Sequence, residues 1–174
     1  VIESLEDVDY FQSIGVRCVN LTWNGSNKIC GGADDQLKGL TLFGRDVVKK
    51  LNEKGILIDV SHLNDKSFYN IAEIVTKPLI ATHSNSRYVC NHRRNLTDDM
   101  FKIICDSGGC VGINLYPPFV KDTGECTIDD VILHIEENYP DLYRSAYNME
   151  AAKLFIDSIF NIDRPEGYYK FDVL

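Results

Sequence analysis

The sequence lacks the features that mark several large classes of protein. No apolar run approaches the ~18 residues of a membrane-spanning helix, so we predict no membrane span. Positive charge is scarce: 18 Lys and Arg stand against 26 Asp and Glu, for a net charge of −8, which argues against nucleic-acid binding through a basic surface. There is no G-x-G-x-x-G or Walker loop and no G-x-S-x-G turn, so nucleotide binding and a serine-hydrolase nucleophile have no support.

Paired cysteine motifs are also missing. The chain has six cysteines but no Cys-x-x-Cys. We predict that they are the reduced thiols of a cytoplasmic protein rather than a disulfide framework. They are Cys18, Cys30, Cys90, Cys105, Cys110 and Cys126.

What is present is the composition of a globular protein with a regular alternation of elements. Apolar residues make up 44% and charged residues 25% of the 174 residues, which suits one soluble domain or part of one. Helical and strand patterns alternate along the chain, which is typical of parallel strands joined by right-handed helical crossovers. We predict helices over residues 4–14, 42–54, 65–75, 97–106, 127–138 and 148–160, and strands over residues 16–22, 56–60, 78–82 and 110–115.

The fold class that follows is α/β. Four parallel strands are half the number in a (β/α)₈ TIM barrel, so we predict a fold of this type of which about half is present. Residues 1–138 form this partial barrel domain in our interpretation. Residues 139–174 are less regular, and we assign them to a helical C-terminal extension.

Two histidines occupy the positions where chemistry is expected in such a fold. His62 and His83 each follow immediately after a short apolar run that predicts a buried strand. Consecutive strands of a βαβ unit lie about 4.8 Å apart, with their carboxyl ends at one edge of the sheet, so both imidazoles can reach one metal ion. Neutral imidazole is a good ligand for zinc and similar ions. Catalytic zinc takes at least three protein ligands, so further ligands must come from carboxylates elsewhere or from residues that the chain lacks.

The other two histidines lie in less informative places. His92 is in a basic loop, and His134 lies along an acidic helix. We predict that both are surface residues.

Two consecutive arginines follow the second histidine. Arg93 and Arg94 lie in the loop after its strand, where a guanidinium could bind a substrate carboxylate through two parallel hydrogen bonds. The alternative is a surface ion pair with Asp98 or Asp99, and the residues alone leave both interpretations open.

Several separate motifs, in order over about residues 5–120, carry a resemblance to a known family. The chain resembles the membrane dipeptidase (renal dipeptidase) family of zinc peptidases, and its bacterial members most closely. The motifs are Gly15-Val16-Arg17, Leu21-Thr22-Trp23-Asn24, Gly39-Leu40-Thr41-Leu42-Phe43-Gly44, Ile58-Asp59-Val60-Ser61-His62, Thr82-His83-Ser84-Asn85-Ser86, Arg93-Arg94-Asn95-Leu96-Thr97-Asp98 and Gly112-Ile113-Asn114-Leu115-Tyr116.

The resemblance implies a (β/α)₈ barrel with a binuclear zinc site and the hydrolysis of dipeptides. It implies that His62 and His83 bind one of the two zinc ions and that Arg94 holds the C-terminal carboxylate of the dipeptide. A hydroxide between the metals attacks the peptide carbonyl in that family. Trp23 stands where mammalian members have histidine and bacterial members often have tryptophan. We assign Trp23 to substrate binding, and aromatic packing at the barrel mouth is the alternative.

Some parts of the family pattern do not match. The His-x-Asp pair of the first strand and the bridging glutamate belong upstream of Val1, and we find no counterpart of the later aspartate. A half barrel also leaves two open, apolar sheet edges, so we expect either association with another chain, as in a homo-oligomer, or an origin in a partial gene. Two alternatives to a dipeptidase therefore stay open: a non-catalytic truncated relative, and another barrel metallohydrolase acting on a different amide or lactone.

Overall fold

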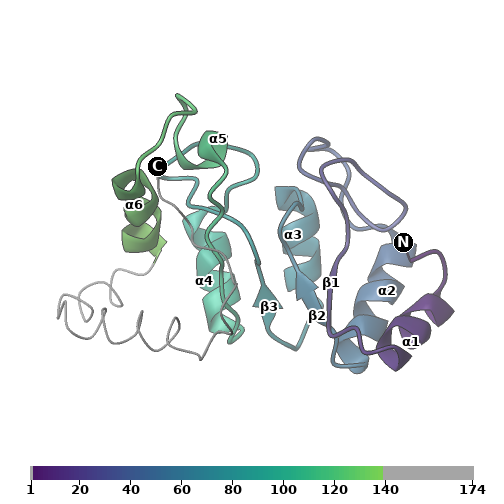
Figure 1. Cartoon of the computed structure of the whole chain (residues 1–174). Coiled ribbons are helices and arrows are strands. Elements are labelled where there is room, and N and C mark those ends of the chain that lie inside the picture. The colour runs from purple at the N-terminus through teal and green to yellow at the C-terminus, as the bar shows by residue number, and fades with distance from the viewer. Residues whose placement is uncertain (1, 139–174) are drawn as a thin grey trace, which may run out of the picture. The chain divides into compact units, whose positions relative to one another are not determined.

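The structure is a computed structural model that describes residues 2–138 of the chain. Helices and strands alternate over residues 5–106 (Figure 1), as the sequence predicts, and two more helices then follow without a strand between them. The predicted extension over residues 139–174, with its helix at 148–160, lies outside the described residues, and the domain boundary stays a prediction.

The helices begin where short polar side chains can cap them. Thr41, Asn64 and Thr97 each accept a hydrogen bond from the backbone N–H three residues later, which satisfies a donor that the first helical turn leaves unpaired. The helices are α1 (Leu5–Ser13), α2 (Leu42–Glu53), α3 (Asp65–Ala72), α4 (Asp98–Asp106), α5 (Pro117–Val120) and α6 (Ile128–Asn138).

Helix α5 was not predicted from the sequence. Its two prolines lie just after the predicted strand over residues 110–115. Pro117 occupies the beginning of the helix, where the missing N–H costs nothing and the fixed φ suits helical backbone.

The strands form a three-stranded parallel sheet in the order β1-β2-β3. Strand β1 is Cys18–Asn20, β2 is Leu57–Asp59 and β3 is Leu79–Ile80. Each consecutive pair is parallel, which confirms the α/β class and the predicted neighbourhood of the two histidine-bearing strands. The loops that follow β1 and β3 lie at the same end of this sheet (Figure 1).

The predicted fourth strand is reduced to a single bridge. Ala81 pairs with Val111 in parallel; the Ala81 N–H donates to Cys110 O at 3.0 Å, and the Gly112 N–H donates to Ala81 O at 2.7 Å. A Cβ at Gly112 would stand 2.3 Å from Thr82 O, so this close approach requires glycine. Pairing starts as predicted and stops after one residue.

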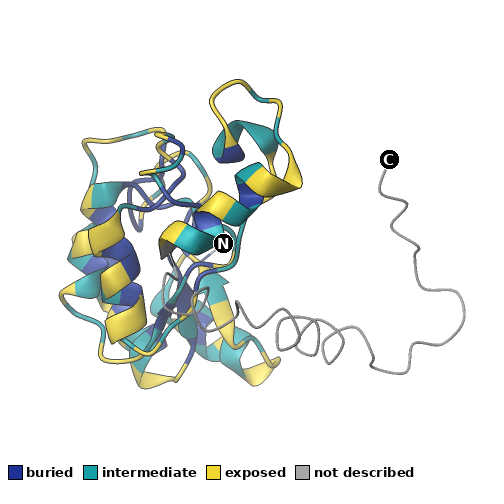
Figure 2. Ribbon diagram, turned by 90° about the vertical axis from the view of Figure 1, so that its left-hand side faces the viewer, coloured by how far each residue is buried: buried dark blue, intermediate teal, exposed yellow. Residues whose placement is uncertain are grey.

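The core lies between the sheet and the helices that cover it. Figure 2 shows buried residues on the inward faces of the helices and exposed residues on their outer faces. Removing these apolar side chains from water is the main driving force of the fold. The largest of the fully buried side chains are Phe68, Leu51, Ile56, Ile71, Leu79, Met100 and Ile104.

Strand β1 is an edge strand with little cover. Cys18 and Asn20 are exposed, and a groove of about 530 Å³ runs beside the strand, lined by apolar residues such as Phe11, Val16 and Leu21. An open sheet edge was expected from the sequence, and the structure has one here. Self-association across this edge stays a prediction. No helix within residues 2–138 has the length and hydropathy needed to cross a membrane.

Candidate metal and substrate site

The two histidine rings that follow β2 and β3 meet at the carboxyl edge of the sheet. The Nε2 atoms of His62 and His83 are 2.8 Å apart, and the ring centroids are 4.8 Å apart with an interplanar angle of 61°. The structure therefore brings together the two residues that the strand positions single out.

His62 adopts a left-handed backbone conformation. Its φ of 75° is the only positive φ of a non-glycine residue within residues 2–138. A side chain in this region costs free energy, and such strain is found where a functional geometry needs it. The left-handed turn lets the chain leave β2 while the imidazole stays at the sheet edge.

Each imidazole is also held through its other nitrogen. The Nδ1 atom of His62 lies 2.8 Å from Asn24 Oδ1, and the Nδ1 atom of His83 lies 2.7 Å from Thr82 Oγ1. The Thr82 hydroxyl donates to Asp59 Oδ2 at 2.5 Å. Asn24, Thr82 and Asp59 were not predicted as site residues. Thr82 directly precedes His83 and Asp59 lies three residues before His62, and this nearness in sequence was the available signal for those two.

The surroundings keep both imidazoles neutral. The pKa of His62 is lowered to about 4 by burial in the first place, then by the charge of Arg94 and then by His83, against the opposing effect of Asp59. Burial and Arg94 lower the pKa of His83 in the same way. Burial raises the pKa of the Asp59 carboxyl, but hydrogen bonds from Thr82 and Ser61 outweigh this effect and lower it. Neutral imidazole is the form that binds a metal ion.

Arg94 is a buried arginine without partners for part of its guanidinium. Its side chain is near enough to the histidines to lower the pKa of both, and the residue is only 4% exposed. The guanidinium carbon lies 5.5 Å from the centroid of the Phe119 ring, while Nε and Nη2 are buried with no hydrogen-bond partner among the described residues. Burial lowers the pKa of Arg94 to about 10, so the group stays charged at neutral pH.

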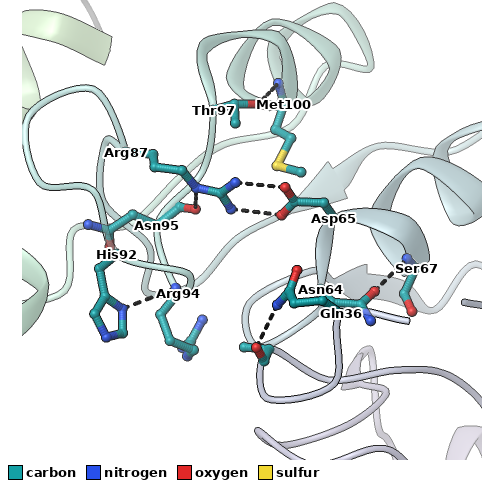
Figure 3. A network of polar contacts seen from close by, with 11 residues as sticks. Gln36, Asn64, Asp65, Ser67, Arg87, His92, Arg94, Asn95, Thr97 and Met100 are labelled. Carbon is teal, nitrogen blue, oxygen red and sulfur yellow. Dashed lines mark hydrogen bonds and ion pairs between the residues drawn. The ribbon is translucent and has the colours of Figure 1, made fainter. Parts of the chain in front are cut away.

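The neighbouring arginines have ordinary structural roles. Arg87 forms two hydrogen bonds with the Asp65 carboxylate, both 2.7 Å long, and Figure 3 shows this pair apart from the Arg94 side chain. Arg93 pairs with Asp34 at 2.7 Å. The predicted alternative, an ion pair with the aspartates that begin α4, is wrong within the described residues.

The surface prediction was wrong for His134 and only partly right for His92. His134 is completely buried: the backbone N–H of Ser86 donates to its Nδ1 at 3.1 Å, and its Nε2 lies 2.9 Å from Val120 O. Its position three residues after buried Val131 in α6 was the missed signal. His92 is half-buried, with its Nδ1 accepting from the Arg94 N–H at 3.1 Å.

Trp23 is at the exposed rim of the histidine pair. The residue is 75% exposed, and its ring centroid is 6.4 Å from that of His62. The indole is therefore available to a bound molecule. Its place on the loop after β1 agrees with the predicted position, and its role in substrate binding stays a prediction.

The histidine pair fits one metal ion but does not complete a site. Two Zn–N bonds of ~2.0–2.1 Å at a tetrahedral angle separate the nitrogens by about 3.3 Å, roughly half an ångström more than the observed spacing, and small side-chain rotations remove this difference. Within residues 2–138 no group of three or more His, Cys, Asp or Glu side chains could hold a metal ion.

Comparison with known proteins shows which family the chain matches. Residues 1–137 match the family model for membrane dipeptidase, peptidase family M19. An uncharacterized protein of Klebsiella pneumoniae is 37% identical over 141 residues, covering 75% of this chain and 52% of the relative. An uncharacterized dipeptidase of Schizosaccharomyces pombe is 31% identical over 150 residues, covering 77% of this chain and 36% of the relative.

A solved structure has the same fold over the matching part. A metallo peptidase from Rhodobacter sphaeroides, liganded with a phosphinate mimic of the dipeptide L-Ala-D-Ala, superposes with a TM-score of 0.73 at 32% identity. The match covers 79% of this chain and 42% of that one, so this chain spans about half the length of its relatives or less. The chain belongs to the membrane dipeptidase family, peptidase family M19.

Proposed function

We propose that the protein is a metal-dependent dipeptidase that hydrolyses dipeptides at a binuclear zinc site in a (β/α)₈ barrel. The observation that carries the proposal is the convergence of the His62 and His83 Nε2 atoms near the buried Arg94 guanidinium, two of whose nitrogens have no hydrogen-bond partner in the described part of the chain. Membership of a dipeptidase family and likeness to a metallo peptidase bound to a dipeptide mimic support it.

In this proposal His62 and His83 hold one zinc ion through their Nε2 atoms. Bound zinc would lower the pKa of a water molecule and stabilise the oxyanion that forms at the peptide carbonyl. The remaining ligands of the two ions lie outside the described residues in our proposal, because residues 2–138 bring no third ligand to the pair.

Arg94 binds the C-terminal carboxylate of the dipeptide in our proposal. A buried N–H without a partner costs about 1–3 kcal/mol, and a carboxylate accepting from Nε and Nη2 would remove this cost at two atoms. The fork of donors matches a carboxylate bidentately. Trp23 would then offer an apolar face to a substrate side chain beside the metal.

The test is a comparison of a dipeptide with its C-terminal amide, with zinc present. We expect wild-type protein to bind the dipeptide about 10- to 100-fold more tightly than the amide, because only the acid forms the charge-assisted pair. In Arg94→Met this preference should disappear. Arg93→Met is the matched control, since Arg93 pairs with Asp34 at the surface, and it should keep the wild-type preference. Equal preference in wild type and Arg94→Met would contradict the assignment.

A second candidate function is non-catalytic binding by a truncated relative. The absence of a third metal ligand within the described residues favours it. Zinc content and turnover of the purified chain separate the two candidates. Two zinc ions per chain with dipeptide hydrolysis support the enzyme, and one ion or fewer without turnover supports the binding protein.

A further inference from the structure

The hydrogen bonds behind the histidine pair decide where each imidazole carries its proton. The Asp59 carboxylate accepts from the Thr82 N–H at 3.1 Å and from the Ser61 N–H at 2.9 Å. It also accepts from the Thr82 hydroxyl at 2.5 Å. Because a hydroxyl has one proton and this one goes to the carboxylate, Thr82 Oγ1 can only accept from His83. The proton of neutral His83 is therefore on Nδ1.

The same reasoning applies to the other ring. Asn24 Oδ1 has no hydrogen and lies 2.8 Å from the Nδ1 atom of His62, so the ring donates to it from Nδ1. Both imidazoles then carry a lone pair on Nε2, and these two lone pairs face each other across 2.8 Å. Two acceptors at this distance repel each other unless a cation lies between them.

We propose that Asn24 and the Thr82–Asp59 pair are positioning residues that hold His62 and His83 in their Nδ1–H tautomers and so aim both Nε2 lone pairs at one divalent cation. The inference rests on the proposed function for the identity of that cation as zinc. It adds which residues prepare the ligands: an amide from the loop after β1, and a hydroxyl–carboxylate pair from the ends of β2 and β3. Such outer partners orient a metal-binding histidine and raise its affinity for the ion.

A neutral hydrogen bond between the rings is the competing arrangement. It needs a proton on the Nε2 atom of one ring, which requires Asn24 to present its amide nitrogen to His62 instead of its oxygen. The two arrangements differ in the tautomer of His62 alone, so a measurement of that tautomer separates them.

The experiment is long-range ¹H–¹⁵N NMR of the metal-free full chain at a pH above 7, where both rings are neutral. We expect the Nδ1–H pattern for His62 and His83. A proton on the Nε2 atom of either ring would overturn the inference. Asn24→Asp keeps the acceptor and Asn24→Leu removes it; Thr82→Ser keeps the hydroxyl and Thr82→Val removes it. Only the apolar variants, Asn24→Leu and Thr82→Val, should allow the neighbouring histidine to carry its proton on Nε2 as well as on Nδ1.

Zinc affinity of the same four variants, measured by competition with a chromophoric chelator, provides the second readout. We expect a loss of about 10- to 100-fold in Asn24→Leu and Thr82→Val and near wild-type affinity in Asn24→Asp and Thr82→Ser. Equal affinity in all four would overturn the positioning role.

The two readouts keep this inference separate from the proposed function. Nδ1–H tautomers in a chain that takes up no zinc would contradict the metal site and leave the tautomer assignment standing. Zinc uptake by a chain with a proton on Nε2 of His62 would contradict this inference and leave the dipeptidase proposal standing.

Discussion

Replacing Arg94 by methionine should stabilise the metal-free and substrate-free protein while abolishing recognition of a substrate carboxylate. The guanidinium is buried, and its Nε and Nη2 atoms have no hydrogen-bond partner within residues 2–138. Methionine keeps an apolar chain of similar length over the Phe119 ring and removes the polar group that water would otherwise solvate.

The size of the effect follows from the cost of burying the guanidinium, which can be expressed in two ways. Two buried guanidinium nitrogens without hydrogen-bond partners cost about 1–3 kcal/mol each. Burial lowers the pKa of Arg94 from 12.5 to about 10, which corresponds to roughly 3 kcal/mol of lost solvation at about 1.4 kcal/mol for each pKa unit. Methionine recovers only part of this free energy, because packing around the new side chain is imperfect. We expect a net stabilisation of about 2 kcal/mol, or a rise in Tm of about 4–8 °C.

Urea unfolding and thermal melts of wild type, Arg94→Met and Arg87→Met test this prediction. Arg87 is the matched control in the same loop, because each of its three guanidinium nitrogens donates a hydrogen bond: Nε donates to Asn95 O at 2.9 Å, and the two terminal nitrogens donate to Asp65. Arg87→Met should lose about 1–3 kcal/mol. Destabilisation of similar size in both variants would refute the view that Arg94 is held without partners for a ligand.

Three further predictions concern the backbone, the packing and the titration of the site. His62→Gly should be about 1 kcal/mol more stable than His62→Ala in urea unfolding, because only glycine relieves the φ of 75°; equal stabilities would mean that the turn is unstrained. Gly109→Ala should lose about 1–3 kcal/mol in the same assay, since its Cβ would stand 1.7 Å from Leu79 O, whereas Gly25→Ala, with nothing within 4 Å, should change little. The pKa of His62 is lower in the folded state than its usual 6.5, at about 4, so the unfolded chain binds the proton more tightly between these values. Stability of the metal-free protein should therefore be unaffected by this group above pH 6.5 and fall as the pH decreases from 6.5 through 4, and His62→Gln should flatten that part of the profile in melts at a series of pH values.

The alternation of elements could be predicted because it depends on local patterns. Capping residues such as Thr41 and Thr97, followed by apolar residues on one helical face, are visible in the sequence. The predicted strands lie at the right places in the sequence, but the strands in the structure are shorter. The fourth shows why: pairing stops after Val111, and the length of a strand depends on what a neighbouring strand offers rather than on its own composition.

The candidate site, too, could be predicted only in part. The meeting of His62 and His83 follows from the topology of a βαβ unit, which the sequence reveals. Asn24 could not be predicted as a partner, because its loop folds back over 38 residues to reach His62. Burial of His134 likewise depends on the packing of α6 against a distant loop. Contacts of this kind are set by tertiary structure, so the local pattern of the sequence does not identify the partner.

Zinc titration of the ¹⁵N-labelled chain, followed through the imidazole nitrogen signals, tests most directly whether His62 and His83 share a metal ion. We expect the Nε2 signals of both rings to move together and to stop moving at one ion per histidine pair, while the signals of buried His134 stay in place. Movement of only one of the two rings, or of neither, would contradict the shared site.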